Sequence, residues 1–375
     1  MIKVKKQMLS LLYAVKLKLS AAKLFLGKKL GLIRSLMILP YDGIGNKHEL
    51  FFLGRVLRDR GIGISQLEDS KWKNFSRMYK RFMTWEIPNV KVKASFKGFS
   101  ETAVADEEGY FRFEIKLDEE HQVTAPWKDI HLELTDRVIK TNQKVQAKCR
   151  VYIPSDDSEY GIISDIDDTI VPTGATRMMD MMRITFFRNA HTRVPFPGVA
   201  AFYQSLAKGT TGKGHNPFFY VSSSPWNLYD FLKELMEVHG IPQGPLLLRD
   251  IGLSRDNLFS GSHSEHKLMQ VERIFRIIED IPFILVGDSG QHDAEIYLQV
   301  IKDFPGRVKM IYIRDVSAFN HKKVKKIAEE VKSHGVEMML VNDTIQAAHH
   351  ALTRRWISDI AMSNVSVDKA EDEAD

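Results

Sequence analysis

The sequence predicts an α/β protein whose main domain is a doubly wound parallel sheet with helices on both faces. Two patterns lead to this prediction. Between residues 86 and 155, apolar and polar residues alternate in short runs separated by turn signals, which is typical of antiparallel strands. From residue 156 onward, short apolar runs alternate with longer helical stretches, as in strand–helix–strand units. A small antiparallel β-sandwich is therefore expected to precede the main domain.

The first 40 residues predict a basic amphipathic helical segment. Leucine, alanine and lysine are abundant between residues 7 and 37, and no acidic residue precedes Asp42. Lysines interrupt every window of the roughly 20 residues that a transmembrane span needs, and they also argue against a secretory signal. Such a helix suits an anionic membrane surface, but the same pattern describes a helix packed on the protein's own core. Both interpretations are open on sequence alone.

Composition favours a cytoplasmic protein, peripheral on the inner membrane surface if the basic helix binds lipid. The 375 residues include 44% hydrophobic and 27% charged residues, with a net charge of +5. The only cysteine, Cys149, cannot form an intramolecular disulfide, so the disulfide-rich secreted class is excluded. Cys149 lies in an alternating run, and we expect it to be buried as a small apolar residue.

Five segments follow from these patterns along the chain. The expected division is a helical segment over 1–40, a connecting segment over 41–85, the β-sandwich over 86–155, the catalytic α/β domain over 156–365, and an acidic disordered tail over 366–375. Six apolar runs are the candidate strands of the parallel sheet: 161–164, 218–221, 245–248, 283–286, 309–313 and 337–341.

The candidate site begins where the first of these runs ends in Asp165-Ile166-Asp167-Asp168-Thr169. Ligands bind at the carboxyl ends of strands in open α/β sheets. Neighbouring carboxylates repel one another unless a cation or a shared proton relieves them, and Mg²⁺ prefers such hard oxygen ligands. The pattern Asp-x-Asp-x-Thr therefore predicts a Mg²⁺ site and a nucleophile on a single turn.

Three further positions supply what phosphoryl transfer requires. The hydroxyls of Ser222-Ser223-Ser224 follow the second strand and can hold a phosphate at a strand-to-helix turn. Lys267 lies early in the helix that leads into the fourth strand and can act as a point charge on phosphate, with His266 as its competitor for that role. Asp288 and Asp293 add two more carboxylates after that strand. One Asp alone often only caps a helix or forms a turn, but the four sites together indicate a catalytic centre.

Each of these side chains receives an expected role. Asp165 is the nucleophile, Asp167 protonates the leaving oxygen and then activates water, and Lys267 completes the catalytic group. The expected phosphate-binding residues are Thr169, Ser222, Ser223 and Lys267. The expected metal ligands are Asp165, Asp167 (through its carbonyl), Asp288 and Asp293.

These four motifs, in this order, resemble those of the haloacid dehalogenase-type phosphatases. A narrower resemblance rests on Ser164–Ile170, Tyr220–Leu228 and Val286–Gly290, which are similar to the actin-patch-protein type of phosphatidate phosphatase, including its bacterial members. The catalytic domain of that group is related to the lipins. The resemblance implies a haloacid dehalogenase-like Rossmannoid fold with little or no cap. It also implies Mg²⁺-dependent removal of phosphate from phosphatidate through an aspartyl phosphate, giving diacylglycerol.

The sequence is consistent with more than one substrate and more than one kind of partner. An insert after the first motif combines Met and Phe residues with arginines, which suits an acyl-phosphate ligand or simply packs a flap onto the core: Arg177, Met178, Met179, Met181, Met182, Arg183, Ile184, Phe186, Phe187, Arg188 and Arg193. A phospholipid substrate and an anionic membrane are the expected partners. Nucleic acid is not expected, because the basic N-terminus lacks interleaved aromatic residues. The alternatives are a phosphatase for a soluble or nucleic-acid phosphomonoester, and a membrane-binding scaffold with a vestigial site.

Overall fold

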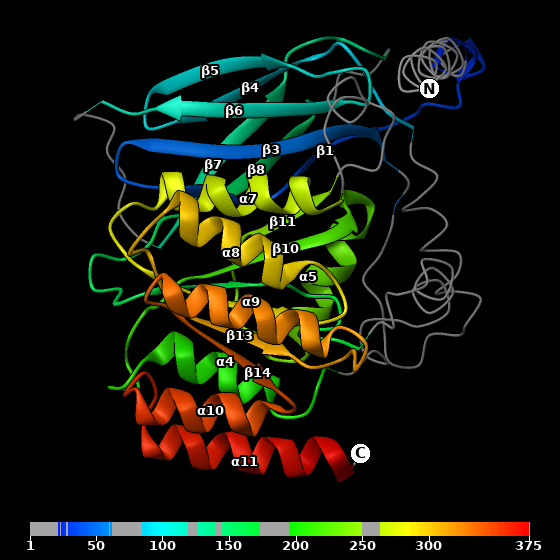
Figure 1. The fold of residues 1–375 in the computed structure, drawn as a ribbon. Coiled ribbons are helices and arrows are strands. Elements are labelled where there is room, and N and C mark those ends of the chain that lie inside the picture. Colours follow the sequence, from blue (N-terminus) through cyan, green and yellow to red (C-terminus); the bar gives the residue numbers. More distant parts are fainter. Residues whose placement is uncertain are drawn as a thin grey trace, which may run out of the picture. The chain divides into compact units, whose positions relative to one another are not determined.

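The computed structural model describes residues 29–59, 85–118, 126–139, 144–172, 195–249 and 263–374, together with positions 22, 24–27 and 61. They form two compact units, a β-unit and an α/β unit, each with its own sheet and core (Figure 1). Most of the predicted N-terminal helix and the whole Met- and Phe-rich insert lie outside the described residues.

The β-unit contains one eight-stranded, mostly antiparallel sheet. Its strand order is β1-β3-β2-β8-β7-β4-β5, with β6 paired to β3, and the β2–β8 pair alone is parallel. The antiparallel strands predicted within residues 86–155 are present, but they join one sheet with β1, β2 and β3 instead of forming a separate small β-sandwich. The strands are β1 (Leu36–Pro40), β2 (Gly43–Gly45), β3 (Glu49–Arg58), β4 (Lys91–Phe96), β5 (Phe99–Val104), β6 (Tyr110–Lys116), β7 (Trp127–Leu134) and β8 (Gln146–Tyr152).

One hydrophobic cluster fills the β-unit. In β6, Phe111, Phe113 and Ile115 are buried while the residues between them are exposed, which is the period-two pattern of a strand with one face on a core. The rings of Phe52 and Phe113 stack with their centroids 5.0 Å apart. Cys149 is fully buried in the same cluster, as expected, and burial raises the pKa of its thiol well above the usual value.

Three segments differ from the sequence prediction. Residues 36–40, expected to belong to the helical segment, form strand β1. Residues 41–85, expected to be connecting, contain β2 and β3, and β3 pairs with both β1 and β6. Because β3 is buried along both faces, it has no period-two signature. The acidic end is a helix, α11 (Asp359–Ala374), rather than a disordered tail. Asp368 and Asp372 accept hydrogen bonds from backbone N–H groups of Ala201 and Gly198.

The α/β unit contains a six-stranded sheet of order β11-β10-β9-β12-β13-β14, in which every pair is parallel. All six candidate strands are confirmed, as β9 (Gly161–Ser164), β10 (Phe218–Pro225), β11 (Leu246–Arg249), β12 (Phe283–Asp288), β13 (Val308–Arg314) and β14 (Glu337–Val341). The helices are α4 (Val199–Lys208), η2 (Trp226–Leu228), α5 (Tyr229–Val238), α7 (His263–Ile277), α8 (Asp293–Asp303), α9 (His321–Ser333), α10 (Thr344–Thr353) and α11.

Helices cover this sheet in two groups. Helices α7, α8 and α9 pack side by side against β10 to β14, whereas α4, α10 and α11 pack on one another. Figure 1 shows β13 and β14 between α9 and the group of α4, α10 and α11. No helix in the described ranges combines the length and the apolar character that crossing a bilayer requires.

The strand order determines where a ligand site can form. Along the chain the sheet first grows from β9 toward β11, then returns to the other side of β9 and grows from β12 toward β14. In open α/β sheets the crevice for a ligand lies outside the carboxyl ends of the strands at such a reversal. Here those ends belong to β9 and β12, and they carry Asp165 and Asp288.

Candidate active site

Asp165 is held rigidly at the end of β9. Its backbone N–H donates to the carbonyl of Val286 in β12, at 2.9 Å, and its side chain is almost completely buried. Thr169 Oγ1 donates to Asp165 Oδ2 at 3.2 Å. The turn that returns Thr169 to Asp165 passes through Asp168 at φ 60°, a left-handed conformation that Asp tolerates better than most residues.

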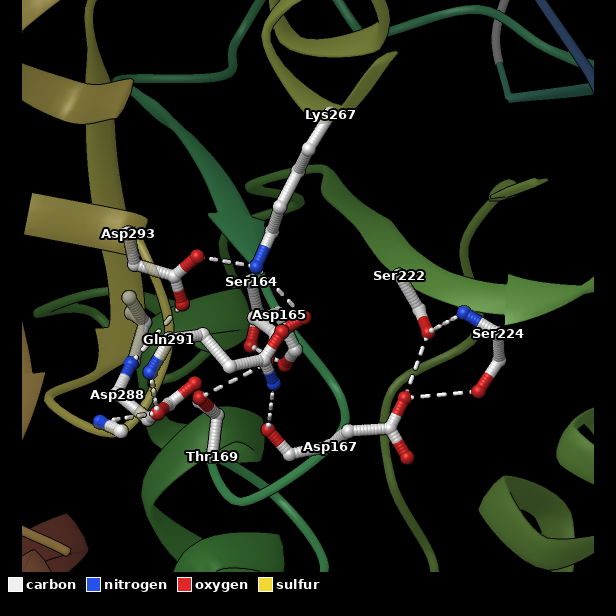
Figure 2. A network of polar contacts seen from close by, with 12 residues as sticks. Ser164, Asp165, Asp167, Thr169, Ser222, Ser224, Lys267, Asp288, Gln291 and Asp293 are labelled. Carbon is white, nitrogen blue, oxygen red and sulfur yellow. Dashed lines mark hydrogen bonds and ion pairs between the residues drawn. The ribbon is translucent and has the colours of Figure 1, made fainter. Parts of the chain in front are cut away.

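Lys267 joins two of the carboxylates. Its Nζ lies 2.9 Å from Asp165 Oδ1 and also forms an ion pair with Asp293 Oδ1 (Figure 2). Burial alone would lower the pKa of Lys267, but Asp165, Asp293 and Asp288 outweigh burial and raise that pKa above its usual value. Lys267 is therefore a permanent cation at the centre of the site, as its expected role requires.

Asp288 presents one occupied and one bare carboxylate oxygen. Oδ1 accepts backbone N–H groups from Gly290 at 2.6 Å and Gln291 at 2.9 Å. Oδ2 is buried and has no hydrogen-bond partner among the described residues. Asp293 Oδ2 in turn accepts the backbone N–H of Asp288 at 3.0 Å. Position 287 must be glycine here, because a Cβ would overlap the Asp293 carboxylate.

Asp165, Asp288 and Asp293 form a cluster that could hold a metal ion. Each offers one oxygen, and these oxygens lie within 4.8 Å of one another. Burial first, and then the mutual repulsion of the carboxylates, raises the pKa of Asp165 and raises the pKa of Asp288 to about 8, although Lys267 acts in the opposite direction. Three buried carboxylates against one ammonium leave surplus negative charge, and the bare Asp288 Oδ2 suits a hard divalent cation. Both oxygens of Asp293 and both oxygens of Asp165 already have a partner, so Asp288, with its bare Oδ2, offers the best-placed direct ligand.

A divalent cation should stabilise the fold, and more so at higher pH. With a folded-state pKa of about 8 against about 4 when unfolded, Asp288 favours the cation-free fold at low pH, and this contribution is lost as the pH rises through 8. We expect the melting temperature without cation to fall between pH 6 and pH 8, and Mg²⁺ to restore it, with the larger increase at pH 8. Thermal melts with EDTA or Mg²⁺ at both values measure this. An equal Mg²⁺ effect in Asp288→Asn would contradict it.

The carboxylate of Asp167 points away from this cluster. Its Oδ2 accepts hydrogen bonds from Ser222 Oγ and Ser224 Oγ, both at 2.8 Å, and the N–H of Ser224 donates to Ser222 Oγ at 2.9 Å (Figure 2). The main-chain carbonyl of Asp167, by contrast, accepts a hydrogen bond from Gln291 Nε2 of the β12 loop at 3.3 Å. The structure therefore separates the Asp167 side chain from the three clustered carboxylates.

Several supporting residues were not predicted from the sequence. Tyr203 of α4 lies with its hydroxyl 2.7 Å from Ser164 Oγ, which donates to the Asp165 carbonyl at 2.6 Å. Arg314 Nε donates to the carbonyl of Thr169 at 3.1 Å. Local sequence carries no signal for either contact. Ser224 and Gln291 lie inside the predicted motifs, but only the fold shows that their side chains reach Asp167.

Apart from the Asp167 side chain, the residues that the sequence predicts for the site lie together, with two exceptions. Ser223 is half-buried, and no hydrogen bond joins it to the carboxylates among the described residues. His266, the competitor of Lys267, lies against Gln270 at 3.3 Å, whereas Lys267 reaches the cluster.

We expect Ser224→Ala to slow turnover about ten-fold, because Asp167 would lose one of the two hydrogen bonds that serine hydroxyls donate to it and with it part of its orientation. The loss should fall on kcat more than on KM, measured by steady-state phosphate release. Ser223→Ala is the matched control, and it should leave kcat unchanged. Wild-type turnover in Ser224→Ala would show that Asp167 does not depend on this hydroxyl.

Comparison with known proteins identifies a family and curated relatives that the chain resembles. Residues 160–315 match the family described as "Phosphatidate phosphatase APP1, catalytic domain". The chain is similar to phosphatidate phosphatase APP1 of Saccharomyces cerevisiae, with 36% identity over 50% of this chain and 30% of the relative. It is also similar to an uncharacterized protein of Schizosaccharomyces pombe, with 25% identity over 68% of this chain and 42% of the relative. The chain thus spans less than half the length of these curated relatives.

Among solved structures, similarity is slight. The crystal structure of a carbohydrate acetylesterase from Xanthomonas citri matches with a TM-score of 0.24 and 12% identity, covering 82% of this chain and 68% of that one.

Proposed function

Residues 160–315 belong to the family of APP1-type phosphatidate phosphatase catalytic domains, and from this premise we propose that the chain is a Mg²⁺-dependent phosphatase of lipid phosphates. The proposed substrate is phosphatidate or a close relative, and the products are diacylglycerol and phosphate. The observation that carries the chemistry is the buried Asp165–Lys267 pair beside two further carboxylates, with Asp167 held separately by two serines.

The proposed reaction has two steps. In the first, a carboxylate oxygen of Asp165 attacks phosphorus, the bond to the lipid oxygen breaks, and Asp167 donates a proton to that oxygen. In the second, Asp167 takes a proton from water as the water attacks phosphorus, which releases phosphate and restores Asp165. The separate environments of the two side chains support this division, because the serine hydroxyls keep Asp167 out of the carboxylate cluster.

Several residues would stabilise the charge of the transferring group. Lys267 supplies the fixed positive charge, and Ser222, within β10, would contact the phosphate only by giving up the hydrogen bond that its hydroxyl donates to Asp167. Asp165, Asp288 and the Asp167 carbonyl would hold Mg²⁺, with Asp293 orienting Lys267 and the Asp288 backbone. When bound, Mg²⁺ would neutralise negative charge on the phosphoryl oxygens.

Unused, this cluster would only destabilise the domain, which argues against a vestigial site. Burial and mutual repulsion raise the pKa values of Asp165 and Asp288, so the ionised cluster is unfavourable without a cation. The proposed location is a cytoplasmic membrane surface, and the basic N-terminal segment is the proposed first contact with it.

A substrate panel tests the proposal. We would measure Mg²⁺-dependent phosphate release from phosphatidate vesicles, lysophosphatidate, sugar phosphates and 5′-phosphorylated oligonucleotides, with Asp165→Asn as the inactive control. Preference for phosphatidate supports the proposal. Preference for a sugar phosphate or an oligonucleotide would replace it with the soluble-substrate alternative, and no Mg²⁺-dependent release from any substrate would indicate a vestigial site.

A further inference from the structure

The loop after β13 is fixed to the catalytic edge of the sheet. Its first anchor is Ser289, the residue that follows Asp288: Ser289 Oγ accepts the backbone N–H groups of Val316 and Ser317, at 2.9 and 3.0 Å. Its second anchor is Asn320, whose Nδ2 donates to the Ser289 carbonyl at 2.7 Å. Residues 315–320 therefore have a defined position directly beside the proposed metal site.

This anchored loop carries an aromatic side chain in solvent. Phe319 is 97% exposed, the highest value among the large hydrophobic residues of the described part of the chain. Val316, three residues earlier, is 39% exposed. A phenylalanine that contributes nothing to its own core, on a loop held by three hydrogen bonds, is a feature of binding surfaces rather than of folding.

Positive charge follows immediately in α9. Its first six residues, about 9 Å of helix, hold four exposed lysines and no acidic residue: Lys322, Lys323, Lys325 and Lys326. Lys323 pairs with Glu295, while the other three form no ion pair with any described residue. The nearest acid in the loop, Asp315, already binds His321 at 2.8 Å and Ser289 at 3.1 Å. Glu329 and Glu330, one turn after Lys325 and Lys326 on the same helix, offset this charge only in part, because Glu330 already pairs with Lys302.

This charge distribution is unfavourable for the isolated helix. The N-terminus of a helix carries the positive end of its dipole, so lysines there are repelled. Lys322 also faces Lys325 and Lys326 at the i+3 and i+4 positions, where like charges destabilise a helix. An external surface of negative charge would relieve both effects.

We propose that Phe319, Lys322, Lys325 and Lys326 form a docking surface for an anionic phospholipid bilayer at the catalytic edge of the α/β unit. Aromatic rings are favourable at the level of the headgroups, and lysines near an anionic leaflet add attraction. The surface lies beside the Asp288 loop, so docking would bring the site to its substrate in the membrane. This use rests on the proposed lipid substrate, whereas the binding itself can be measured without catalysis.

The single cysteine makes a site-specific probe possible in the full chain. Because Cys149 is 0% exposed, a thiol-reactive environment-sensitive dye should label a Phe319→Cys variant only at position 319. We expect its emission to shift to the blue and intensify with vesicles of phosphatidylcholine containing phosphatidylglycerol, and to stay unchanged with phosphatidylcholine alone. In vesicle co-sedimentation, Phe319→Ser should bind about ten-fold more weakly. Each lysine replaced by glutamine should weaken binding about five-fold at low salt.

Matched controls separate docking from general charge and hydrophobicity. The triple variant Lys322→Gln/Lys325→Gln/Lys326→Gln is compared with Lys208→Gln/Lys213→Gln/Lys332→Gln, which removes the same charge from other exposed sites. Phe319→Ser is compared with Ile360→Ser, since Ile360 is 76% exposed on α11. Both controls should bind vesicles like the unaltered protein. All variants should hydrolyse a soluble phosphomonoester at the rate of the unaltered protein.

The outcomes distinguish this proposal from the proposed function. Equal losses in the test and control variants, or no change of dye emission with vesicles, would overturn the docking surface. Emission that rises with protein concentration but not with vesicles would assign the surface to a second copy of the chain and also overturn the proposal. Vesicle binding through position 319 without phosphate release from phosphatidate would support docking and refute the substrate. Release that does not depend on Phe319 or the lysines would refute docking alone.

Discussion

Asp165→Asn should abolish phosphate release while leaving the fold intact. An asparagine amide cannot replace a carboxylate as the nucleophile, so we expect turnover to fall by at least about 10⁴-fold. No other carboxylate in the described part of the chain has both Lys267 and Thr169 against it. Steady-state phosphate release from phosphatidate and from a soluble phosphomonoester measures the loss, which should be the same for both.

The same substitution should not destabilise the cation-free protein. Three buried carboxylates share one ammonium, and burial followed by repulsion raises the pKa of Asp165, so a neutral amide removes an unfavourable charge. Lys267 keeps its ion pair with Asp293. We therefore expect a melting temperature equal to or higher than that of the unaltered protein in EDTA, so that lost activity cannot be attributed to unfolding.

Asp167→Asn is the informative contrast for this prediction. It retains the nucleophile but loses the group that protonates the leaving oxygen and activates water. With an aryl phosphate, whose leaving group needs no proton, a phosphorylated protein should therefore accumulate and be visible by mass spectrometry after acid quenching. Asp165→Asn should show no such species. Residual turnover above about 1% in Asp165→Asn, or a phosphorylated protein in that variant, would refute the assignment of the nucleophile.

Much of the α/β unit could be predicted because its signals are local. Strands such as β9 and β12 are buried along their whole length, so they are continuous apolar runs that end sharply at polar residues. Parallel strands then bring their carboxyl ends to one edge, and this alone places Asp165 near Asp288. Lys267 could be added because its helix leads into β12.

The direction in which a side chain points, and contacts from elements distant in sequence, could not be predicted from local patterns. Whether the Asp167 carboxylate turns toward the metal cluster or the serines depends on the turn between β9 and Val171, which spacing does not determine. Tyr203 and Arg314 act from elements distant in sequence, and β3 lacks alternation because both its faces are buried. The acidic end is helical because its carboxylates meet the first backbone N–H groups of α4, a tertiary contact.

Lys267→Met should inactivate the protein and destabilise it as well. Methionine approximates the length of the lysine side chain but leaves Asp165 and Asp293 buried without their cation. Breaking one partner of a buried pair costs about 3–5 kcal/mol, much of it from the charge left behind. Protonation of the carboxylates relieves that charge, so the loss of stability should be larger at pH 8 than at pH 6. Urea denaturation in EDTA at both values measures it.

A second substitution shows whether uncompensated charge is the cause. In Lys267→Met/Asp293→Asn one buried carboxylate is gone, and part of the stability should return, with a coupling of about 0.5–3 kcal/mol in the double-mutant cycle. Lys302→Met is the matched control, because Lys302 pairs with Glu330 on the exposed surface and little change is expected there. Activity should remain absent in the double variant, since the phosphoryl group would still lack the Lys267 charge.

A Lys267→Met protein as stable as the original at pH 8, or additive effects in the cycle, would mean that the carboxylates do not depend on Lys267. The cluster would then have to be neutral or bind a cation tightly enough to need no lysine, and Mg²⁺ titration of the variant would distinguish these two cases.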